Sequence, residues 1–390
     1  TIGDFDSKIF PIPESLKQSI IEYIKNDETN YPPADGVMSL RKSVSDFIKR
    51  RFDLDYNTNE ILIGGGARPM IYSLYRTILD EGDKVIFSVP SWNNNHYSYL
   101  TSAQQIIIET KPGNNFMISA DEIRPHISEV SIIALCSPQN PTGTTLTKEG
   151  LIEICNLIVE ENKNRVGKKP VYLMYDQIYS ELCFGVEHVN PVSLVPEMRE
   201  WAIYVDGISK SLSATGIRVG WAFGPQSVIS KMKSILGHIG AWAPKAEQLA
   251  TSDFISSDNY ETFLENQKSK IVLKLNHLYR EIKKLKSEGY PVDIIKPEGA
   301  IYLSLKLDII GSTIGNTFID SSEKITTFLI DNAGVAIVPF SAFGSTNKLP
   351  WFRISIGTLN DSDIPNVVSG FRSALDLLQP TSSPEVNQQS

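Results

Sequence analysis

Cysteine, histidine and long apolar runs are all scarce in this sequence, and each scarcity excludes something. Among 390 residues there are three cysteines, Cys136, Cys155 and Cys183, an odd number without a C-x-x-C pair. A disulfide framework is therefore not expected, and we predict a reducing, cytoplasmic location. The five histidines show no metal-ligand spacing, so we predict no metal site. The apolar runs have the length of strands, far below the ~20 residues of a membrane span.

An excess of basic residues is also absent. The chain has 37 Lys and Arg against 45 Asp and Glu, a formal net charge of −8. Sequence-independent binding to nucleic acid needs a net basic face, so we expect no nucleic-acid partner, and no membrane partner either. No signal-peptide pattern is visible. The chain begins without Met, and we expect residues upstream of Thr1.

The length and the pattern of apolar residues predict an α/β protein of two domains. A soft prior of roughly 150 residues per domain makes the chain too long for one small core. Apolar, β-branched runs bounded by helix-like stretches such as 68–79 and 147–164 indicate a mostly parallel sheet covered by helices on both faces. The seven predicted strands are at residues 60–65, 84–89, 105–109, 131–136, 171–175, 202–206 and 219–223.

The pattern changes after this predicted sheet. Residues 245–287 predict one or two long helices. A smaller α/β domain is predicted from strands at 300–305, 335–338 and 351–356 and from helices at 322–332 and 361–378. The predicted division is a large domain of residues 31–277, a small domain of residues 1–30 and 278–378, and a polar tail of residues 379–390.

Polar residues follow the carboxyl ends of the predicted strands, where open α/β sheets bind their ligands. The small-residue turn Gly66-Ala67-Arg68 opens a helix and offers backbone N–H groups to an anion. The residues that follow the other strands are Trp92, Asn140, Asp176, Tyr179, Ser209, Lys210 and Arg218. No acid–base hydrolase needs that set, whereas a flat, phosphorylated, nitrogen-containing aromatic aldehyde needs all of it.

Three pieces of this pattern resemble one family when they are taken together and in this order. They are N-P-T-G at residues 140–143, D-x-x-Y at 176–179, and S-K at 209–210 with an arginine eight residues after the lysine. The chain resembles fold-type I pyridoxal-phosphate-dependent enzymes, in particular class I/II aminotransferases of the aspartate aminotransferase group. The resemblance implies pyridoxal 5′-phosphate as cofactor, amino-acid and 2-oxo-acid substrates, and a homodimer.

The resemblance also implies roles in holding the cofactor. Lys210 resembles the lysine that forms the Schiff base and shuttles a proton, for which its amine must be largely neutral. Asp176 resembles the carboxylate that keeps the pyridine nitrogen protonated, so that the ring can accept electrons. Arg218 resembles the arginine that binds the phosphate. The rest of the implied phosphate site is Ser209 and the backbone N–H groups of Gly66 and Ala67.

Two further residues resemble ligands of the cofactor ring, and a third forms its wall. Asn140 and Tyr179 resemble the pair that hydrogen bonds the phenolic oxygen, and Trp92 resembles the aromatic residue that stacks on the ring. Tyr179 and Trp92 each have an ordinary alternative, helix packing for the tyrosine and a core position for the tryptophan. The chain departs from the family at Gly207, where relatives often carry a hydroxyl three residues before the lysine, so one phosphate hydrogen bond is left unassigned.

The substrate side of the site is implied in the same way. Arg353 resembles the arginine that binds the substrate α-carboxylate, and Gly3 resembles the glycine segment that lies over the substrate. Arg68 has two alternatives: it receives the distal carboxylate of an acidic substrate, or it adds charge to the phosphate site or points to solvent. Phe340 replaces a glycine that is frequent in relatives, which could reshape the substrate pocket. Tyr31 resembles a tyrosine donated to the partner subunit's phosphate, with an ordinary loop tyrosine as the alternative.

The expected activity is the transfer of an amino group between an L-amino acid and a 2-oxo acid. The same residues would also serve β- or γ-elimination or decarboxylation, because the Cα bond that stands perpendicular to the ring decides the outcome. A cofactor-sensing regulatory domain is a further alternative. Such regulators carry an added basic DNA-binding domain, whereas this chain has an acidic balance.

Overall fold

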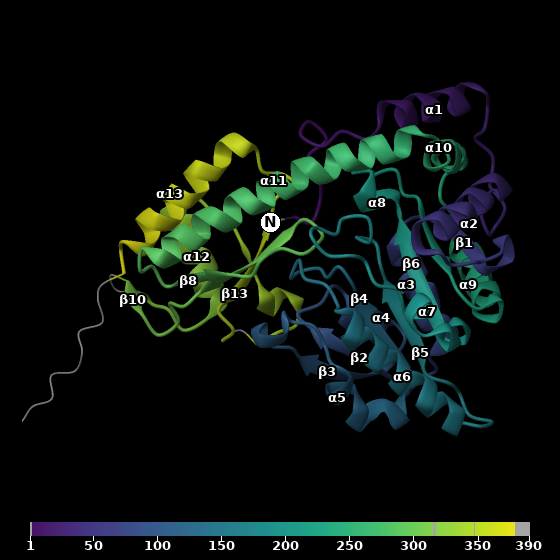
Figure 1. Cartoon of the computed structure of the whole chain (residues 1–390), viewed down its shortest axis with the longest axis horizontal. Coiled ribbons are helices and arrows are strands. Elements are labelled where there is room, and N and C mark those ends of the chain that lie inside the picture. Colours follow the sequence, from purple (N-terminus) through teal and green to yellow (C-terminus); the bar gives the residue numbers. More distant parts are fainter. Residues whose placement is uncertain (1, 315–316, 347, 379–390) are drawn as a thin grey trace, which may run out of the picture.

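The computed structural model describes residues 2–314, 317–346 and 348–378 (Figure 1). The predicted polar tail, residues 379–390, lies outside the described residues. Within the described ranges no helix combines the length and apolarity that crossing a membrane would require.

A seven-stranded sheet forms the larger part of the molecule, with strand order β1-β7-β6-β5-β4-β2-β3. Its strands are β1 (Ile61–Gly64), β2 (Lys84–Val89), β3 (Gln104–Glu109), β4 (Val130–Cys136), β5 (Tyr172–Asp176), β6 (Ala202–Gly207) and β7 (Gly220–Phe223). The β2, β3, β4, β5 and β6 strands pair in parallel, and β7 is antiparallel to β6 and β1. The predicted mostly parallel sheet is therefore confirmed, with strand ends that agree to one residue.

Helices cover both faces of this sheet because alternate strand residues point to opposite sides. On one face, Leu62 and Phe87 belong to a core shared with α3 (Ala67–Ile78), α4 (Asn94–Leu100) and α9 (Gln226–Ile239). On the other face, Ile63 and Ile86 belong to the main core. That core includes residues of α1 (Glu14–Lys25), α2 (Met38–Phe52), α6 (Lys148–Asn164) and α10 (Lys245–Ile255).

A second sheet has four antiparallel strands in the order β12-β13-β9-β8. They are β8 (Val292–Ile294), β9 (Tyr302–Leu307), β12 (Val338–Pro339) and β13 (Trp351–Ser355), accompanied by α12 (Ser322–Ala333) and α13 (Ile364–Leu375). The long helix α11 (Asn259–Ser287) runs from the large sheet to this small one (Figure 1). The predicted smaller α/β part is confirmed, although the strand expected at 335–338 is confined to Val338–Pro339.

The remaining elements are short. They are α5 (Ala120–Ile123), α7 (Pro191–Leu194), α8 (Ile208–Ser211), β10 (Thr313–Ile314) and β11 (Thr317–Phe318). The 3₁₀ turns are Thr58–Glu60, Pro112–Asn114, Arg124–Glu129, Pro196–Glu200, Phe340–Phe343 and Asp361–Asp363. Among the short elements, α8 matters most for function because it follows β6 at the carboxyl edge of the large sheet.

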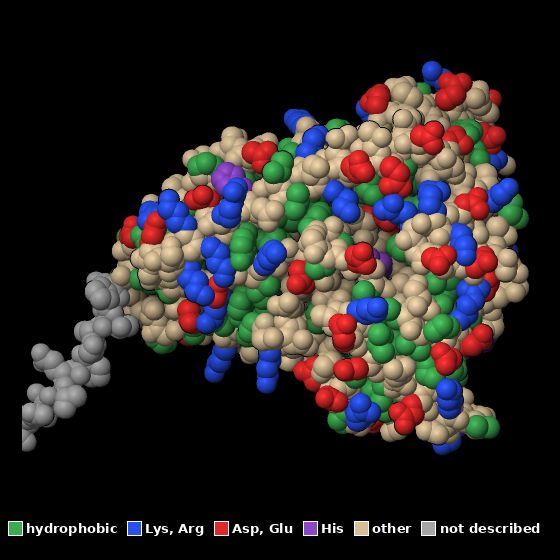
Figure 2. Space-filling model, viewed as in Figure 1, with side chains coloured by type: hydrophobic (Ala, Val, Ile, Leu, Met, Phe, Trp, Pro, Cys, Tyr) green, Lys and Arg blue, Asp and Glu red, His purple; other side chains and the backbone are tan. Residues whose placement is uncertain are grey.

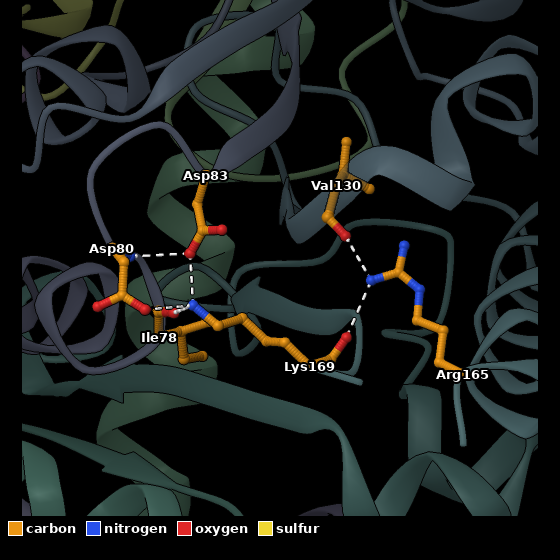
Figure 3. A network of polar contacts seen from close by, with 6 residues as sticks. All are labelled: Ile78, Asp80, Asp83, Val130, Arg165 and Lys169. Carbon is orange, nitrogen blue, oxygen red and sulfur yellow. Dashed lines mark hydrogen bonds and ion pairs between the residues drawn. The ribbon is translucent and has the colours of Figure 1, made fainter. Parts of the chain in front are cut away.

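A polar network ties together the opposite, amino-terminal edge of the large sheet (Figure 3). Lys169, in the loop before β5, donates to Asp80 at 2.7 Å and to Asp83 at 2.5 Å, both in the segment before β2. Arg165 donates to the backbone carbonyl of Val130 at the start of β4. Exposed ion pairs contribute little stability, so the main effect of these contacts is to hold three loops in register.

Candidate active site

A cavity of about 600 Å³ opens at the carboxyl ends of the parallel strands. Its volume lies in the range of small-molecule sites. The predicted site residues that line it are Gly3, Ala67, Arg68, Trp92, Asn140, Asp176, Tyr179, Ser209, Lys210, Arg218 and Arg353. The two other predicted residues, Gly66 and Tyr31, lie outside its lining. One cavity thus collects residues that are up to 350 positions apart in the chain, from Gly3 to Arg353.

Asp176 ends β5 and is half-buried at the cavity. Burial raises the pKa of its carboxyl group to about 6, opposed by the backbone N–H of Ile178 and by the charge of Lys210. Ile178 N–H donates to Asp176 Oδ1 at 3.1 Å. Among the described residues no cation forms an ion pair with Asp176. A cationic group of a ligand would therefore find a desolvated carboxylate that still needs a counter-charge.

Lys210 lies in α8, directly after β6. Burial lowers the pKa of its amine to about 8, opposed by Asp4 and assisted by the positive charges of Arg353, Arg68 and Arg218. Its Nζ atom donates to the backbone carbonyl of Gly3 at 2.5 Å. An amine with this pKa is partly neutral in mildly alkaline solution, as a nucleophile requires.

Arg218 stands against the start of α3. Its guanidinium donates to the carbonyls of Thr215 and Gly65, at 2.6 and 2.7 Å. Gly66 has φ of +93°, and a Cβ at this position would overlap the Arg218 guanidinium. Only glycine therefore permits the arginine to lie beside the helix N-terminus formed by Ala67. An arginine next to free helix N–H groups is an anion site.

Gly207 explains why the expected hydroxyl is missing from this site. A Cβ at Gly207 would lie 2.7 Å from Gly220 Cα and 2.9 Å from the Val219 carbonyl oxygen, so the close approach of β7 leaves no room for a side chain. A phosphate here must find its hydroxyl elsewhere, and Ser209 is the predicted hydroxyl residue that lines the cavity.

The small sheet contributes Arg353, which lies in β13 with 3% of its surface exposed. Its Nη1 donates to Asn140 Oδ1 at 2.8 Å. Its guanidinium is 4.7 Å from the ring centres of both Tyr302 and Phe343. Trp92 stands at the rim, 38% exposed, with the Arg68 guanidinium 5.4 Å from its ring centre.

The N-P-T-G loop joins the two sheets. The backbone N–H groups of Glu298 and Gly299 donate to the Gly143 carbonyl, at 2.9 and 3.0 Å. Gly143 has φ of +72°, and a Cβ there would overlap the carbonyl oxygen of Tyr302. Glycine at this position therefore serves both the turn and the close passage of β9, which brings Asn140 within reach of Arg353.

The sequence reasoning missed Tyr302. It is fully buried, and its hydroxyl lies 2.6 Å from the Tyr179 hydroxyl. No local signal marked it, because a tyrosine in an apolar run reads as an ordinary core residue. Other polar cavity residues were also not assigned, namely Asp4, Asn94, Tyr97, Cys136 and Thr215. Burial raises the pKa of the Cys136 thiol well above its usual value, which leaves it protonated and unreactive.

Two predicted features lie away from the cavity. Tyr31 is 81% exposed and packs edge-on against Trp242, with ring centres 5.1 Å apart, in a separate hollow of about 820 Å³. Phe340 is fully buried against Phe116 and is not among the residues that line the cavity, so it does not reshape the substrate pocket by direct contact. Within the described residues no group of three or more His, Cys, Asp or Glu side chains could hold a metal ion.

The cavity fits pyridoxal phosphate on three observations. Arg218 and the start of α3 form an anion site, Asp176 lacks a cationic partner among the described residues, and the Lys210 amine lies in the same cavity. A ligand with a phosphate, a basic ring nitrogen and an aldehyde would match each of these groups.

Comparison with known proteins agrees with this fit. Residues 2–371 match the family described as aminotransferase class I and II. An aspartate aminotransferase of Bacillus sp. (strain YM-2) is 29% identical over 356 residues, which cover 90% of this chain and 85% of that protein. A probable aspartate/prephenate aminotransferase of Rickettsia felis is 29% identical over 359 residues, covering 90% of this chain and 83% of the relative.

Solved structures are similar over nearly the whole chain. The aspartate aminotransferase from Rhizobium meliloti superposes with a TM-score of 0.89 at 24% identity, covering 97% of this chain and 91% of that one. The Thermus thermophilus aspartate aminotransferase with maleate gives a TM-score of 0.84 at 25% identity, covering 96% and 90%. The chain belongs to the aminotransferase class I and II family.

It is a pyridoxal-phosphate-dependent aminotransferase, and this prediction from the sequence is confirmed. The elimination, decarboxylation and regulatory alternatives find no support in these relatives.

Proposed function

We propose that the cavity at the carboxyl edge of the large sheet is the active site, with Lys210 as the residue that binds the cofactor covalently. The observation that carries this proposal is that one cavity brings together Lys210, Asp176, Arg218 and Arg353. When bound through the substrate amino group, pyridoxal phosphate would supply a ring that accepts electrons from the substrate Cα. Everything else in the reaction is positioning and proton movement by the chain.

Lys210 moves the proton. Its amine, with a pKa lowered to about 8, would accept a proton from the substrate Cα and deliver it to C4′, the former aldehyde carbon of the cofactor. Asp176 holds a proton on the ring nitrogen, because a buried carboxylate without a counter-charge is stabilised by a cation beside it. Amino transfer therefore depends on a neutral amine at Lys210 and on a negative charge at Asp176.

The remaining cofactor contacts fall to residues around the rim and the anion site. Arg218, Ser209 and the backbone N–H groups of Gly66 and Ala67 bind the phosphate. Tyr179 and Asn140 hydrogen bond the phenolic oxygen, and Trp92 stacks on the ring. These roles are supported by the shared cavity and by the Arg218 contacts at the start of α3.

Substrate binding uses both sheets. Arg353 binds the α-carboxylate while the Gly3 segment covers the substrate. Arg68 receives a second, distal carboxylate, so acidic amino acids are the preferred donors. Support comes from the exposed position of Arg68 on the cavity wall and from relatives named aspartate aminotransferases.

The assembly and the location are part of the same proposal. The enzyme is a homodimer in which Tyr31 reaches the phosphate of the neighbouring subunit. Residues 31–277 form the large domain, and residues 1–30 with 278–378 form the small one, joined by α11. A cytoplasmic location is supported by the three cysteines, all of which have free thiols.

The attachment site gives the most direct test. Borohydride reduction of the yellow holoenzyme, followed by peptide mapping, should place the pyridoxyl group on Lys210. Adding amino acids one at a time without an oxo acid should convert the visible absorbance band of the cofactor only for true donors. A label on another lysine would overturn the Lys210 assignment, and ammonia release in place of band conversion would overturn amino transfer.

A further inference from the structure

Tyr302 sits at the junction of the two sheets. It begins β9 and pairs with Ser355 of β13, two residues from Arg353. Its hydroxyl and that of Tyr179 are 2.6 Å apart, and either atom can be the donor. The rings meet edge-on, with centres 5.7 Å apart. The pair connects a residue of the small sheet with a lining residue of the active site.

The backbone around Tyr302 is tightly held. Its carbonyl lies where a Cβ of residue 143 would be, and residue 143 is glycine. The Ser304 hydroxyl donates to the Thr142 carbonyl at 2.8 Å. Since the neighbouring residues are bonded to the N-P-T-G loop, that loop holds the backbone of Tyr302 in place. The Tyr302 side chain is fully buried, so its ring is enclosed by packing.

The ring of Tyr302 also faces the Arg353 guanidinium, whose Cζ is 4.7 Å from the ring centre. Phe343 lies at the same distance from Arg353. Two aromatic faces thus support one cation in a buried position, an arrangement that is worth more when water is excluded.

The two phenols share two protons. Burial raises the pKa of both hydroxyls, opposed by the positive charge of Arg353, so both stay uncharged. The other titratable groups that act on the pair are Cys136, on both phenols, and Asp4, on Tyr302. Lys210 Nζ lies 5.7 Å from the Tyr179 ring centre.

Only one direction of the hydrogen bond leaves Tyr179 free to act as a donor in the cavity. Tyr179 lines the cavity, whereas Tyr302 does not. If Tyr179 donates to Tyr302, its single proton is used away from the ligand. If Tyr302 donates to Tyr179, the Tyr179 proton is directed into the cavity, and accepting a bond makes Tyr179 a stronger donor.

We propose that Tyr302 is a positioning residue: its hydroxyl donates to Tyr179 and so directs the Tyr179 proton to the cofactor, while its ring supports Arg353. This inference rests on the roles proposed above for Tyr179 and Arg353. It makes two separable predictions, one for the hydroxyl and one for the ring.

The hydroxyl is tested with Tyr302→Phe, followed through the pH at which the visible absorbance of the bound cofactor changes. A hydrogen bond from Tyr179 spreads the negative charge of the phenolic oxygen. A weaker hydrogen bond leaves more negative charge on the phenolic oxygen, so the nitrogen that joins Lys210 to the cofactor keeps its proton to higher pH. The midpoint should rise by about half a pH unit. Tyr179→Phe should raise it further, and adding Tyr302→Phe to that variant should change nothing more, because Tyr302 acts through Tyr179.

The ring is tested by the Michaelis constant for the amino donor. Tyr302→Phe keeps the aromatic face and should leave KM within about twofold, whereas Tyr302→Leu should raise KM about tenfold as Arg353 loses one support. The matched control is Tyr204→Phe. Tyr204 is fully buried and its hydroxyl donates to Asn190 at 2.6 Å, but it does not line the cavity. The Tyr204→Phe variant should leave both the pH midpoint of the absorbance change and the KM for the amino donor unchanged.

The outcomes separate this inference from the proposed function. A midpoint that moves in Tyr179→Phe but not in Tyr302→Phe would overturn the hydroxyl role alone. A Tyr302→Phe shift that persists in the Tyr179→Phe background would overturn the claim that Tyr302 acts through Tyr179. Equal KM values for the Phe and Leu variants would overturn the ring role. If Tyr179→Phe itself left the midpoint unchanged, the cofactor role of Tyr179 would fail, and this inference with it.

Discussion

At the scale of single residues, the buried charge of Asp176 destabilises the cofactor-free protein, and a cationic ligand would offset this. Its folded pKa of about 6 lies above the ordinary value of 3.8, so the folded chain holds this proton more tightly than the unfolded chain does. The stability contributed by the group is complete below about pH 4 and is lost as pH rises through about 6. In the cofactor-free protein at pH 8, Asp176 is therefore destabilising.

Asp176→Asn should accordingly stabilise the cofactor-free protein, with a melting temperature about 2 °C above wild type at pH 8 and a smaller difference at pH 5. Thermal melts at the two pH values measure this. With cofactor bound, the same variant should lose several orders of magnitude in turnover. Asp121→Asn, at a side chain that is 92% exposed, is the control and should show neither effect. A gain in stability that is the same at both pH values would contradict the assigned cause.

Arg68 is the residue on which substrate preference depends. Arg68→Ala should reduce kcat/KM for aspartate or glutamate by the equivalent of about 2–4 kcal/mol, with little change for alanine or leucine, because only the acidic donors lose a charge partner. Arg76→Ala, on an exposed position of the same helix, is the matched control. Equal losses for both kinds of donor would assign Arg68 to the phosphate, and no loss at all would assign it to the solvent.

At the scale of elements, the N-P-T-G loop and β9 depend on each other through Gly143. Gly143→Ala should lower the melting temperature and weaken amino-acid binding, because the new Cβ would push against the Tyr302 carbonyl. Gly185→Ala separates the two causes. Gly185 has the same φ of +72° but nothing within 4 Å of a new Cβ, so it reports backbone strain alone, about 1–2 kcal/mol. The excess loss in Gly143→Ala is the steric contribution, and two equal losses would argue against it.

The elements themselves were largely predictable. Apart from the largely exposed edge strand β3, each strand of the large sheet is a short apolar run that ends at glycine, proline or a polar residue, so its bounds follow from burial on both faces. The strand at 335–338 was misplaced because that run also fits a partly buried loop leading into the 3₁₀ turn Phe340–Phe343. The antiparallel direction of β7 was not predictable, since an apolar run carries no information about direction.

At the scale of the whole molecule, the exposed Tyr31 is the residue that bears on the proposed homodimer. Tyr31 and Tyr99 are each 81% exposed and Leu100 is 57% exposed, so these large side chains offer apolar surface for a contact. The face drawn in Figure 2 shows acidic and basic side chains interspersed over both parts of the molecule. The proposed homodimer, with Tyr31 against the partner subunit, would account for its exposure in the single chain.

Complementation tests the shared site. Tyr31→Ala should weaken cofactor binding about tenfold and Lys210→Ala should abolish turnover. When the two variants are co-expressed, the mixed dimer has one site with both residues intact. At limiting cofactor, activity should recover to about a quarter of wild type, since half the dimers are mixed and half their sites complete. Activity no greater than the sum of the separate variants would place Tyr31 with its own chain.

The sequence by itself determined the order of the strands along the chain, the residues at their carboxyl ends and, through the spacing of a few of them, the family. These are local properties: a buried strand needs an apolar run, and a cofactor needs polar groups where that run ends. Only the tertiary structure decided which distant groups meet. Tyr302 contacts a residue 123 positions away, Phe340 turns into a separate aromatic cluster, and Gly207 lacks a side chain because β7 passes within 2.7 Å of where its Cβ would be. Close packing between segments far apart in the chain produces these features, and no local pattern encodes it.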